Sequence, residues 1–243
     1  MYSIAEYCNN SILNIWRHYL DENSTELIPL LYNCIKSNCI LFVGLNPSFN
    51  VKAIKNRLNK TDLEDDDIKN FFQWKNYNKN VYNKAIEDNK EAVKNYNYYR
   101  KLEIIAHEDL KEYWTHIDLF YNRETNQNNI KHKIYSNIKN DLLNQFANKQ
   151  IELTWHIIKM IDPKLVVVQN VLASKIFKES FKQNINNYEK IVNSEEGYET
   201  IKINDAFIPI FFSGMLSGQR ALDNFSYFRL RWHIKRSYNI HYR

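Results

Sequence analysis

The chain has 243 residues, 44% of them hydrophobic and 14% aromatic, and a formal net charge of +5. This length suits one α/β core with insertions, and the apolar content excludes a generally disordered chain. No apolar run approaches the roughly 20 residues that cross a bilayer, and the N-terminus lacks the basic and then apolar pattern of a signal peptide. We therefore expect a single domain over residues 1–243 that stays in the cytoplasm and has no membrane partner.

Hydrophobic patterning predicts strands that alternate with helices. Short apolar runs predict central strands at residues 39–43, 114–120, 165–168 and 207–212, with an edge strand or hairpin at 198–203. Helical spacing predicts helices at residues 12–20, 27–35, 98–110, 141–161, 171–181 and 221–236. N-terminal helices thus occupy residues 1–38, and a polar Lys/Asn/Tyr-rich insertion covers about 49–97. The expected fold is α/β, a three-layer α/β/α sandwich around a mostly parallel four-stranded sheet.

Glycine is rare, and three of the four glycines follow predicted central strands. Gly44 follows the first strand, and Gly214 and Gly218 follow the last one. Glycine is needed where the backbone takes positive φ or approaches another group closely, and ligands bind beyond the carboxyl ends of parallel strands. We expect both loops to face one site; ordinary turn chemistry is the alternative.

The first of these loops resembles a motif of a known family. Val43-Gly44-Leu45-Asn46-Pro47-Ser48 is similar to the first motif of the uracil-DNA glycosylase superfamily, in its Gly-x-Asn-Pro form. The order of the later strands and helices is similar as well, over roughly residues 40–234. The resemblance implies that Asn46 positions the water that attacks C1′ of a flipped nucleotide, and that Gly44, Leu45, Pro47 and Ser48 contact the substrate.

The second loop matches the position of the family's second motif. It reads Ser213-Gly214-Met215-Leu216-Ser217-Gly218-Gln219-Arg220, and it lacks the histidine that many members have there. The resemblance implies that Ser213, Gly214 and Met215 contact the substrate and that Ser217, Gly218, Gln219 and Arg220 contact DNA. Leu216, or Met215 if the register shifts by one residue, is expected to wedge into the hole left by the flipped base.

The resemblance also implies a base pocket. The base reader of the second strand corresponds to His116 or Asp118, and we favour Asp118, because a carboxylate accepts from the exocyclic amine of a cytosine derivative. Phe71 or Phe72 is expected to stack on the base. Each of these side chains has a structural alternative, since a lone histidine or an apolar residue is often part of a core.

Positive charge gathers at the C-terminal end. No acidic residue follows Asn224, whereas this segment contains five basic residues, Arg229, Arg231, Lys235, Arg236 and Arg243. Such a segment attracts a phosphate backbone, because neutralised phosphates release counterions. A solvated helix face is the alternative.

These features together predict a monofunctional DNA glycosylase that acts in repair or anti-phage defence without a metal or organic cofactor and without an obligate protein partner. The alternative is an inactive protein of the same fold that binds modified DNA. The three cysteines, Cys8, Cys34 and Cys39, are too few for the four-cysteine iron–sulfur cluster of some family members. We interpret them as buried, reduced thiols.

Overall fold

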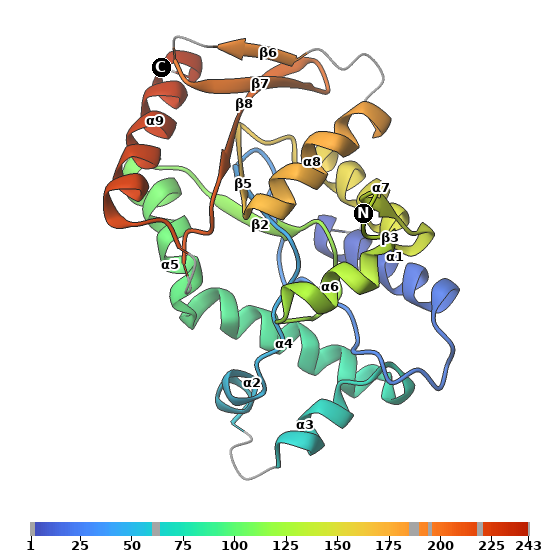
Figure 1. The fold of residues 1–243 in the computed structure, drawn as a ribbon. Helices are drawn as coiled ribbons and strands as arrows, with labels where there is room; N and C mark the ends of the chain where they lie inside the picture. The colour runs from blue at the N-terminus through green and yellow to red at the C-terminus, as the bar shows by residue number, and fades with distance from the viewer. Residues whose placement is uncertain (1–2, 60–63, 185–189, 194–195, 218–220, 243) are drawn as a thin grey trace. The chain divides into compact units, whose positions relative to one another are not determined.

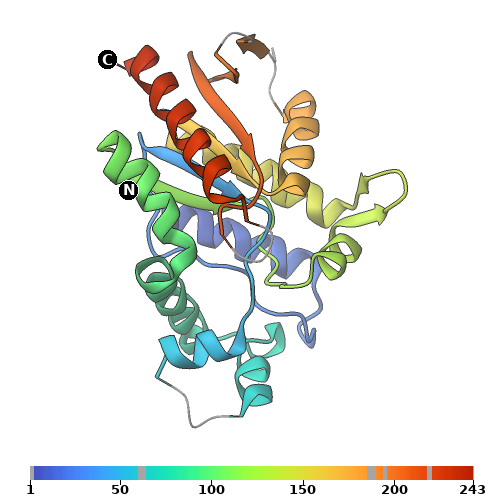
Figure 2. The ribbon, with the colours of Figure 1, turned by 60° about the vertical axis from the view of Figure 1, so that its left-hand side comes forward.

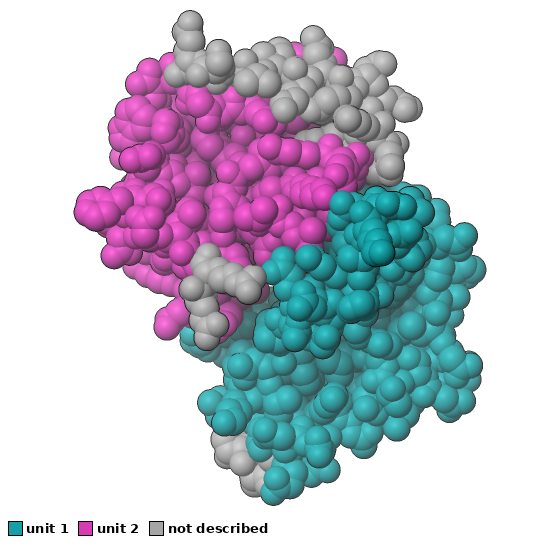
Figure 3. Space-filling view, viewed as in Figure 1, with its two compact units in different colours: residues 1–34, 46–95, 120–154 teal, residues 35–45, 96–119, 155–243 magenta. Residues whose placement is uncertain are grey.

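The computed structural model describes residues 3–59, 64–184, 190–193, 196–217 and 221–242 (Figure 1). The chain divides into two compact units (Figure 3). Unit 1 comprises Met1–Cys34, Asn46–Asn95 and Phe120–Thr154, and unit 2 comprises Ile35–Leu45, Tyr96–Leu119 and Trp155–Arg243. Each unit is built from three separate stretches of chain, so neither is contiguous in sequence.

Unit 2 contains a six-stranded sheet in the order β2-β1-β5-β8-β7-β6. Its first four strands are parallel: β2 (Trp114–Asp118), β1 (Ile40–Gly44), β5 (Leu165–Gln169) and β8 (Ala206–Ser213). Beyond β8 the sheet continues with the antiparallel strands β7 (Tyr198–Ile203) and β6 (Lys190–Asn193). The expected mostly parallel α/β sheet is confirmed, and residues 198–203 form an inner strand of an added hairpin.

Helices cover both faces of this sheet, as a three-layer α/β/α sandwich requires (Figure 2). On one face, α5 (Asn97–Glu103), the π-helix η2 (Ile104–Leu110) and α9 (Asn224–Tyr242) share a buried core with β1, β5 and β8. On the other face, α8 (Val171–Asn184) places the ring of Phe177 6.2 Å from that of Phe212. β1 and β5 are buried along their whole length, which explains their unbroken apolar sequences.

Unit 1 is mainly helical. Its elements are α1 (Ile4–Tyr19), α2 (Val51–Arg57), α3 (Asp65–Phe71), the 3-10 turn η1 (Trp74–Asn76), α4 (Lys79–Asn95), α6 (Gln127–Ile134) and the hairpin strands β3 (Tyr135–Asn137) and β4 (Leu142–Leu143). α7 (Gln145–Ile161) contributes residues to both units. The stretch expected to be a polar insertion thus contains three α-helices, and the helix expected from residue 141 starts at Gln145, after the hairpin.

The expected helix over residues 27–35 is wrong, because this segment is irregular apart from an isolated β-bridge between Leu27 and Gln73. Pro29 lies within it, and proline lacks an N–H group and disfavours helical geometry in the residue before it. The apolar side chains are still buried, since Ile28 and Leu31 are 0% exposed. The backbone N–H of Ile28 donates to Phe72 O at 2.8 Å. The apolar spacing therefore indicated burial correctly but not the type of element.

The described helices and the three cysteines bear on two further expectations. Within the described parts of the chain, no helix has the length and apolarity needed to cross a membrane. Cys8, Cys34 and Cys39 are all free thiols, and the first and last of them are buried. Cys34 is exposed, so the expectation of a buried thiol is wrong at this position.

Candidate functional site

Four neighbouring parallel strands of unit 2 end at the same level, and polar side chains lie at that level. Gly44 of β1 pairs with Asp118 of β2, and Gln169 of β5 pairs with Ser213 of β8. The pairing of β1 with β5 ends one residue before Gly44 and Gln169, so these two residues are the next neighbours in register. Matching positions of a parallel sheet point to the same face. We call these four residues the polar row; it marks the carboxyl edge of the sheet, where ligands bind in open α/β proteins.

Two aromatic side chains extend the polar row. His116 lies two residues before Asp118 on β2, so both side chains are on the same face. The hydroxyl group of Tyr98, from α5, lies 3.1 Å from His116 Nε2 and donates to Gln169 Oε1 at 3.2 Å. Because the hydroxyl proton goes to Gln169, the Tyr98 oxygen accepts from His116, which assigns the imidazole proton to Nε2. The chain of donation therefore runs from His116 through Tyr98 to Gln169.

The carboxyl group of Asp118 fills the space beside Gly44. A Cβ atom at Gly44 would overlap with Oδ1 of Asp118 and lie 3.0 Å from His116 Nε2. Gly44 does not have positive φ. Glycine is needed here because the Asp118 carboxyl group approaches the backbone closely. Close approach, and not positive φ, is therefore the reason for glycine at this position.

The polar row is uncharged at neutral pH. Asp118 is 3% exposed, and burial raises its pKa to about 8. Burial lowers the pKa of His116 to about 3; although His116 is only partly buried, this shift leaves its ring neutral. Burial, and next the charge of Asp118, raise the pKa of Tyr98 well above its usual value. The expectation of a carboxylate at Asp118 is therefore corrected: the neutral acid both donates and accepts hydrogen bonds.

The loop after β8 begins with Ser213 and Gly214. Ser213 Oγ donates to Gly214 O at 2.9 Å, and both residues are partly buried. A Cβ atom at Gly214 would lie 3.1 Å from Cδ2 of Leu222, so the loop packs closely on the segment that leads into α9. Substrate contact by Ser213 and Gly214 stays a prediction.

The expected DNA wedge is wrong for Leu216. Its side chain is 0% exposed and belongs to the core beneath α9, so it has no surface to insert into a duplex. Met215 is partly buried, and it remains the predicted wedge, as does the predicted DNA contact of the partly buried Ser217. Gly218, Gln219 and Arg220 lie outside the described residues.

Asn46 belongs to unit 1, and backbone carbonyl groups hold its amide. Its Nδ2 lies 2.7 Å from Glu124 O, 3.1 Å from Pro47 O and 3.2 Å from Asn122 O. Only the amide nitrogen donates to a carbonyl group, so three carbonyl neighbours determine which end of the amide is the nitrogen. Oδ1 is then the end of the Asn46 side chain that accepts a hydrogen bond. An acceptor of this kind is what the orientation of a water molecule requires.

Further hydrogen bonds hold the segment that contacts Asn46. Gln150 of α7, which is 0% exposed, donates to Asn122 Oδ1 at 3.1 Å and accepts from Tyr121 N at 2.8 Å. The hydroxyl groups of Ser48 and Thr125 are 3.1 Å apart. Ser48 is exposed, and its hydroxyl group ties the two segments together.

Ion pairs connect the helices of residues 49–97 to the same segment. Asp88 of α4 accepts from Arg57 Nε at 2.7 Å and from Arg123 Nη1 at 3.1 Å. The side chains of Asp88 and Arg123 are only 6% and 2% exposed, and loss of one partner of a buried ion pair costs roughly 3–5 kcal/mol. The stretch expected to be an insertion is therefore part of the framework that positions the Asn46 loop.

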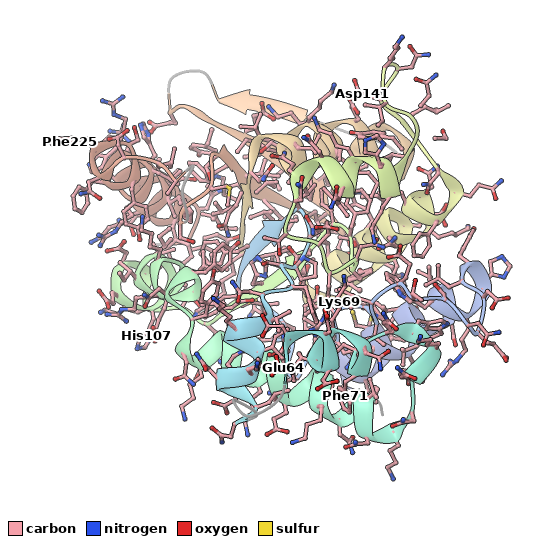
Figure 4. All side chains as sticks on the ribbon, turned by 60° about the horizontal axis from the view of Figure 1, so that its bottom comes forward. Glu64, Lys69, Phe71, His107, Asp141 and Phe225 are labelled. Atoms are coloured by element: carbon pink, nitrogen blue, oxygen red, sulfur yellow. The ribbon has the colours of Figure 1, made fainter. Side chains whose placement is uncertain are left out.

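The aromatic residues expected to stack on a base differ in burial. Phe72 is 0% exposed, and its ring packs edge-on against Phe49 and Phe71, at centroid distances of 6.0 and 5.0 Å. It is a core residue, so its expected stacking role is wrong. Phe71, at the end of α3, is partly buried, and its role stays a prediction (Figure 4).

Carboxylates offset much of the positive charge of α9. Arg231 makes two hydrogen bonds of 2.7 Å to Asp109, and Arg236 binds both carboxylate oxygens of Glu196, at 2.6 and 2.9 Å. Arg229 and Lys235 are exposed, and neither has a carboxylate partner in the described part of the chain. Arg231 is largely covered and held by Asp109, so it is not freely available to phosphate. The Arg236 side chain is 51% exposed, so its DNA contact stays a prediction, and Arg243 is outside the described residues.

Exposed aromatic residues share α9 with these cations. Phe225, Phe228 and Trp232 are 84%, 57% and 56% exposed, and Figure 4 shows Phe225 pointing outward. The guanidinium group of Arg236 lies 5.4 Å from the ring centroid of Trp232. Around Trp232 there is a depression of about 700 Å³, lined by Glu196, Trp232, Lys235, Arg236, Asn239 and Ile240. Aromatic and basic side chains together are typical of surfaces that bind single-stranded nucleic acid.

The sequence does not single out Tyr98, Gln169 or the aromatic residues of α9 as site residues. Gln169 follows three consecutive valines, and a polar residue at the end of a buried parallel strand was a usable signal. Tyr98 lies in a tyrosine-rich stretch whose sequence does not single out one ring.

No protein-family model matches this chain, and no curated protein matches it either. Among the residues that the structure describes, no three His, Cys, Asp or Glu side chains form a group able to hold a metal ion. A functional conclusion therefore depends on the side chains of the polar row, the Asn46 loop and α9.

Proposed function

We propose that this chain is a DNA glycosylase that extrudes a damaged or modified base and hydrolyses its N-glycosidic bond, in repair or in defence against phage. The observation that carries the proposal is the polar row with its buried, neutral Asp118. Burial of an ionisable group is costly, and such groups concentrate at functional sites, above all at the carboxyl edge of a parallel sheet.

The proposed reaction needs an oriented water and a stabilised leaving base. Water adds to C1′ as the bond from C1′ to the base nitrogen breaks, and the base leaves with the bonding electron pair. Oδ1 of Asn46 accepts a hydrogen bond from the water, and Nδ2 is held by backbone carbonyl groups. The O–H group of neutral Asp118 donates to the base as negative charge develops on it. The product is an abasic site and the free base.

Neutral Asp118 widens the choice of base. A carboxylate only accepts, which favours an amino group, whereas a neutral acid pairs with one acceptor and one donor. Uracil presents O4 and N3–H, and cytosine presents N3 and the N4 amino group, so both offer such a pair. The proposed substrates are therefore uracil-type bases and modified cytosines.

α9 supports DNA as the partner. Extrusion of a base costs on the order of a few kcal/mol, which contacts elsewhere on the strand must offset. The exposed Arg229 and Lys235 suit phosphate contacts, and Phe225, Phe228 and Trp232 suit stacking on unpaired bases.

The test uses labelled duplexes with uracil, thymine mismatches, hydroxymethylcytosine or glucosylated hydroxymethylcytosine, each treated with alkali after incubation. We expect strand scission on one of these substrates and a loss of about 100-fold or more in the Asn46→Ala variant. Thr125→Val is the matched control, because it removes the hydroxyl contact to Ser48 and leaves the Asn46 amide in place. Equal losses in both variants would assign Asn46 a structural role only.

An inactive DNA-binding protein is the second candidate. The observation in its favour is the absence of histidine from residues 213–220. Tight, salt-sensitive binding without scission of any duplex would support it and contradict the glycosylase proposal.

A further inference from the structure

One donor of the polar row has no partner within the described parts of the chain. Gln169 is 2% exposed, and its Nε2 atom is buried without a hydrogen bond, whereas its Oε1 accepts from the Tyr98 hydroxyl group at 3.2 Å. A buried amide that lacks one hydrogen bond destabilises the folded protein. An unpaired buried donor calls for a partner from outside the chain, such as a water, an ion or a ligand, or for a functional role.

We propose that Nε2 of Gln169 donates a hydrogen bond to the 2-carbonyl oxygen of a bound pyrimidine base, and that Tyr98 is the residue that positions the Gln169 amide for this contact. The inference rests on the proposed function, because it assigns a specificity contact within the same site. It adds a residue on β5 to a site whose expected base reader is on β2.

The position of Gln169 supports this assignment. Gln169 and Asp118 are on either side of Gly44 in the polar row, and the Asp118 carboxyl group leans over Gly44, where a Cβ atom would overlap with it. The Asp118 carboxyl group and the Gln169 amide therefore lie near each other on the same face of the sheet, where one planar base edge would meet both groups. Asp118 suits N3 and the group at position 4, which leaves the 2-carbonyl oxygen for Gln169.

The chemistry of the base supports it as well. Uracil and cytosine differ at N3 and at position 4, and both have a carbonyl group at position 2. A donor that is held in one orientation suits the invariant group, and a neutral acid that both donates and accepts suits the variable pair. The ligand class is therefore a pyrimidine with a 2-carbonyl group.

The experiment compares free bases with analogues that lack this carbonyl. Dissociation constants are measured by ligand-observed NMR for uracil against 4-pyrimidinone and for cytosine against 4-aminopyrimidine. We expect the wild-type protein to bind at least one of the two bases about tenfold more tightly than its analogue, which is the value of one good hydrogen bond. The binding ratio is the dissociation constant of the analogue divided by that of the base. It is expected to fall to about one in Gln169→Met and to fall partly in Tyr98→Phe.

Stability measurements separate this contact from a structural role. Gln169→Met removes a buried donor that lacks a partner, so we expect its Tm to be no lower than that of the wild-type protein. Asn9→Leu is the control: the Asn9 amide is 2% exposed, and it donates to Tyr32 O at 2.9 Å and accepts from Tyr32 N at 2.8 Å. This variant is expected to lose stability and to keep the binding ratio.

Three results would overturn the inference: no binding of any of the four bases, a wild-type ratio near one for both pairs, or a ratio that Gln169→Met leaves unchanged. Scission assays on the wild-type protein run in parallel. Scission with an unchanged ratio in Gln169→Met would reject this contact and leave the glycosylase proposal intact. If the binding ratio depends on Gln169 but no duplex is cut, the contact is supported and the glycosylase activity is rejected.

Discussion

Asp118 illustrates how one buried carboxyl group shapes its surroundings. Its side chain is 3% exposed, and a Cβ atom at position 44 would force this carboxyl group to move. The protein keeps this acid neutral through burial, whereas most carboxyl groups of a folded protein remain ionised at the surface. This arrangement costs stability, and it supplies an O–H donor and a carbonyl acceptor at one point.

Ionisation of Asp118 should make stability depend on pH. Its pKa is raised to about 8, so between about pH 4 and pH 8 the unfolded chain is ionised at this position and the folded chain is protonated. Stability is therefore lost as pH rises through this range. The lowered pKa of His116, about 3, acts in the opposite direction, but only below pH 6.5, where the unfolded histidine is protonated. Above pH 6.5 the contribution of Asp118 stands alone.

We expect the Asp118→Asn variant to lack this loss, because an amide has the shape of the neutral acid and does not ionise. Between pH 6.5 and pH 8 the free energy of unfolding of the wild-type protein should fall relative to that of the variant by about 2 kcal/mol. Urea denaturation at pH 5, 6.5 and 8 measures the difference. Parallel pH profiles of the two proteins would show that Asp118 is already ionised at neutral pH.

At the scale of the element, α9 differs from a simple basic helix. Arg231 and Arg236 each form a bidentate ion pair with a carboxylate of unit 2. The cations that remain, Arg229 and Lys235, lie among exposed aromatic residues. The charge available to a ligand is therefore smaller than the sequence indicates, and the aromatic surface is larger.

This division of roles predicts different effects of charge removal on DNA binding. The double variant Arg229→Gln/Lys235→Gln should lower the slope of log K against log salt concentration by about 1.8, because each lost phosphate contact on duplex DNA removes about 0.9. Arg231→Gln should leave the slope unchanged and lower the Tm, because Asp109 then loses its partner. Fluorescence anisotropy of a labelled duplex at several salt concentrations measures the slopes. A larger change for Arg231→Gln than for the double variant would contradict the assignment.

At the scale of the whole molecule, three free thiols report on the opening of the two units. Cys8 lies in unit 1 and Cys39 in unit 2, and both are 0% exposed. Burial raises the pKa of both thiols, that of Cys39 to about 11. Reaction with a disulfide reagent needs an exposed thiolate, so these two thiols react only when the structure around them opens.

We therefore expect one fast thiol, Cys34, and two slow ones in the folded protein. Ellman's reagent should modify Cys34 first, and low concentrations of urea should accelerate the other two reactions. Cys34→Ser should remove the fast phase and leave the slow phases unchanged. Three equally fast thiols would contradict the burial of Cys8 and Cys39.

The sequence by itself predicted the central strands and the helices that alternate with them. These predictions succeeded because unbroken apolar runs mark strands that are buried on both faces, and this signal is local. The sequence also indicated Gly44 and Asn46 as loop residues of the site; the structure places Gly44 against Asp118 and holds the Asn46 amide with three carbonyl groups, and their functional roles stay predictions.

Only the tertiary structure decided whether Leu216 is core or surface, whether residues 27–35 are helical or irregular, and which arginines of α9 are paired. It also decided that burial raises the pKa of Asp118, that Gln169 belongs to the polar row and that Tyr98 donates to Gln169. Burial, ion pairing and pKa shifts depend on partners far away in sequence, such as Arg231 and Asp109 or Tyr98 and Gln169. Local patterns determine which elements form, and contacts between distant segments determine what each side chain can do.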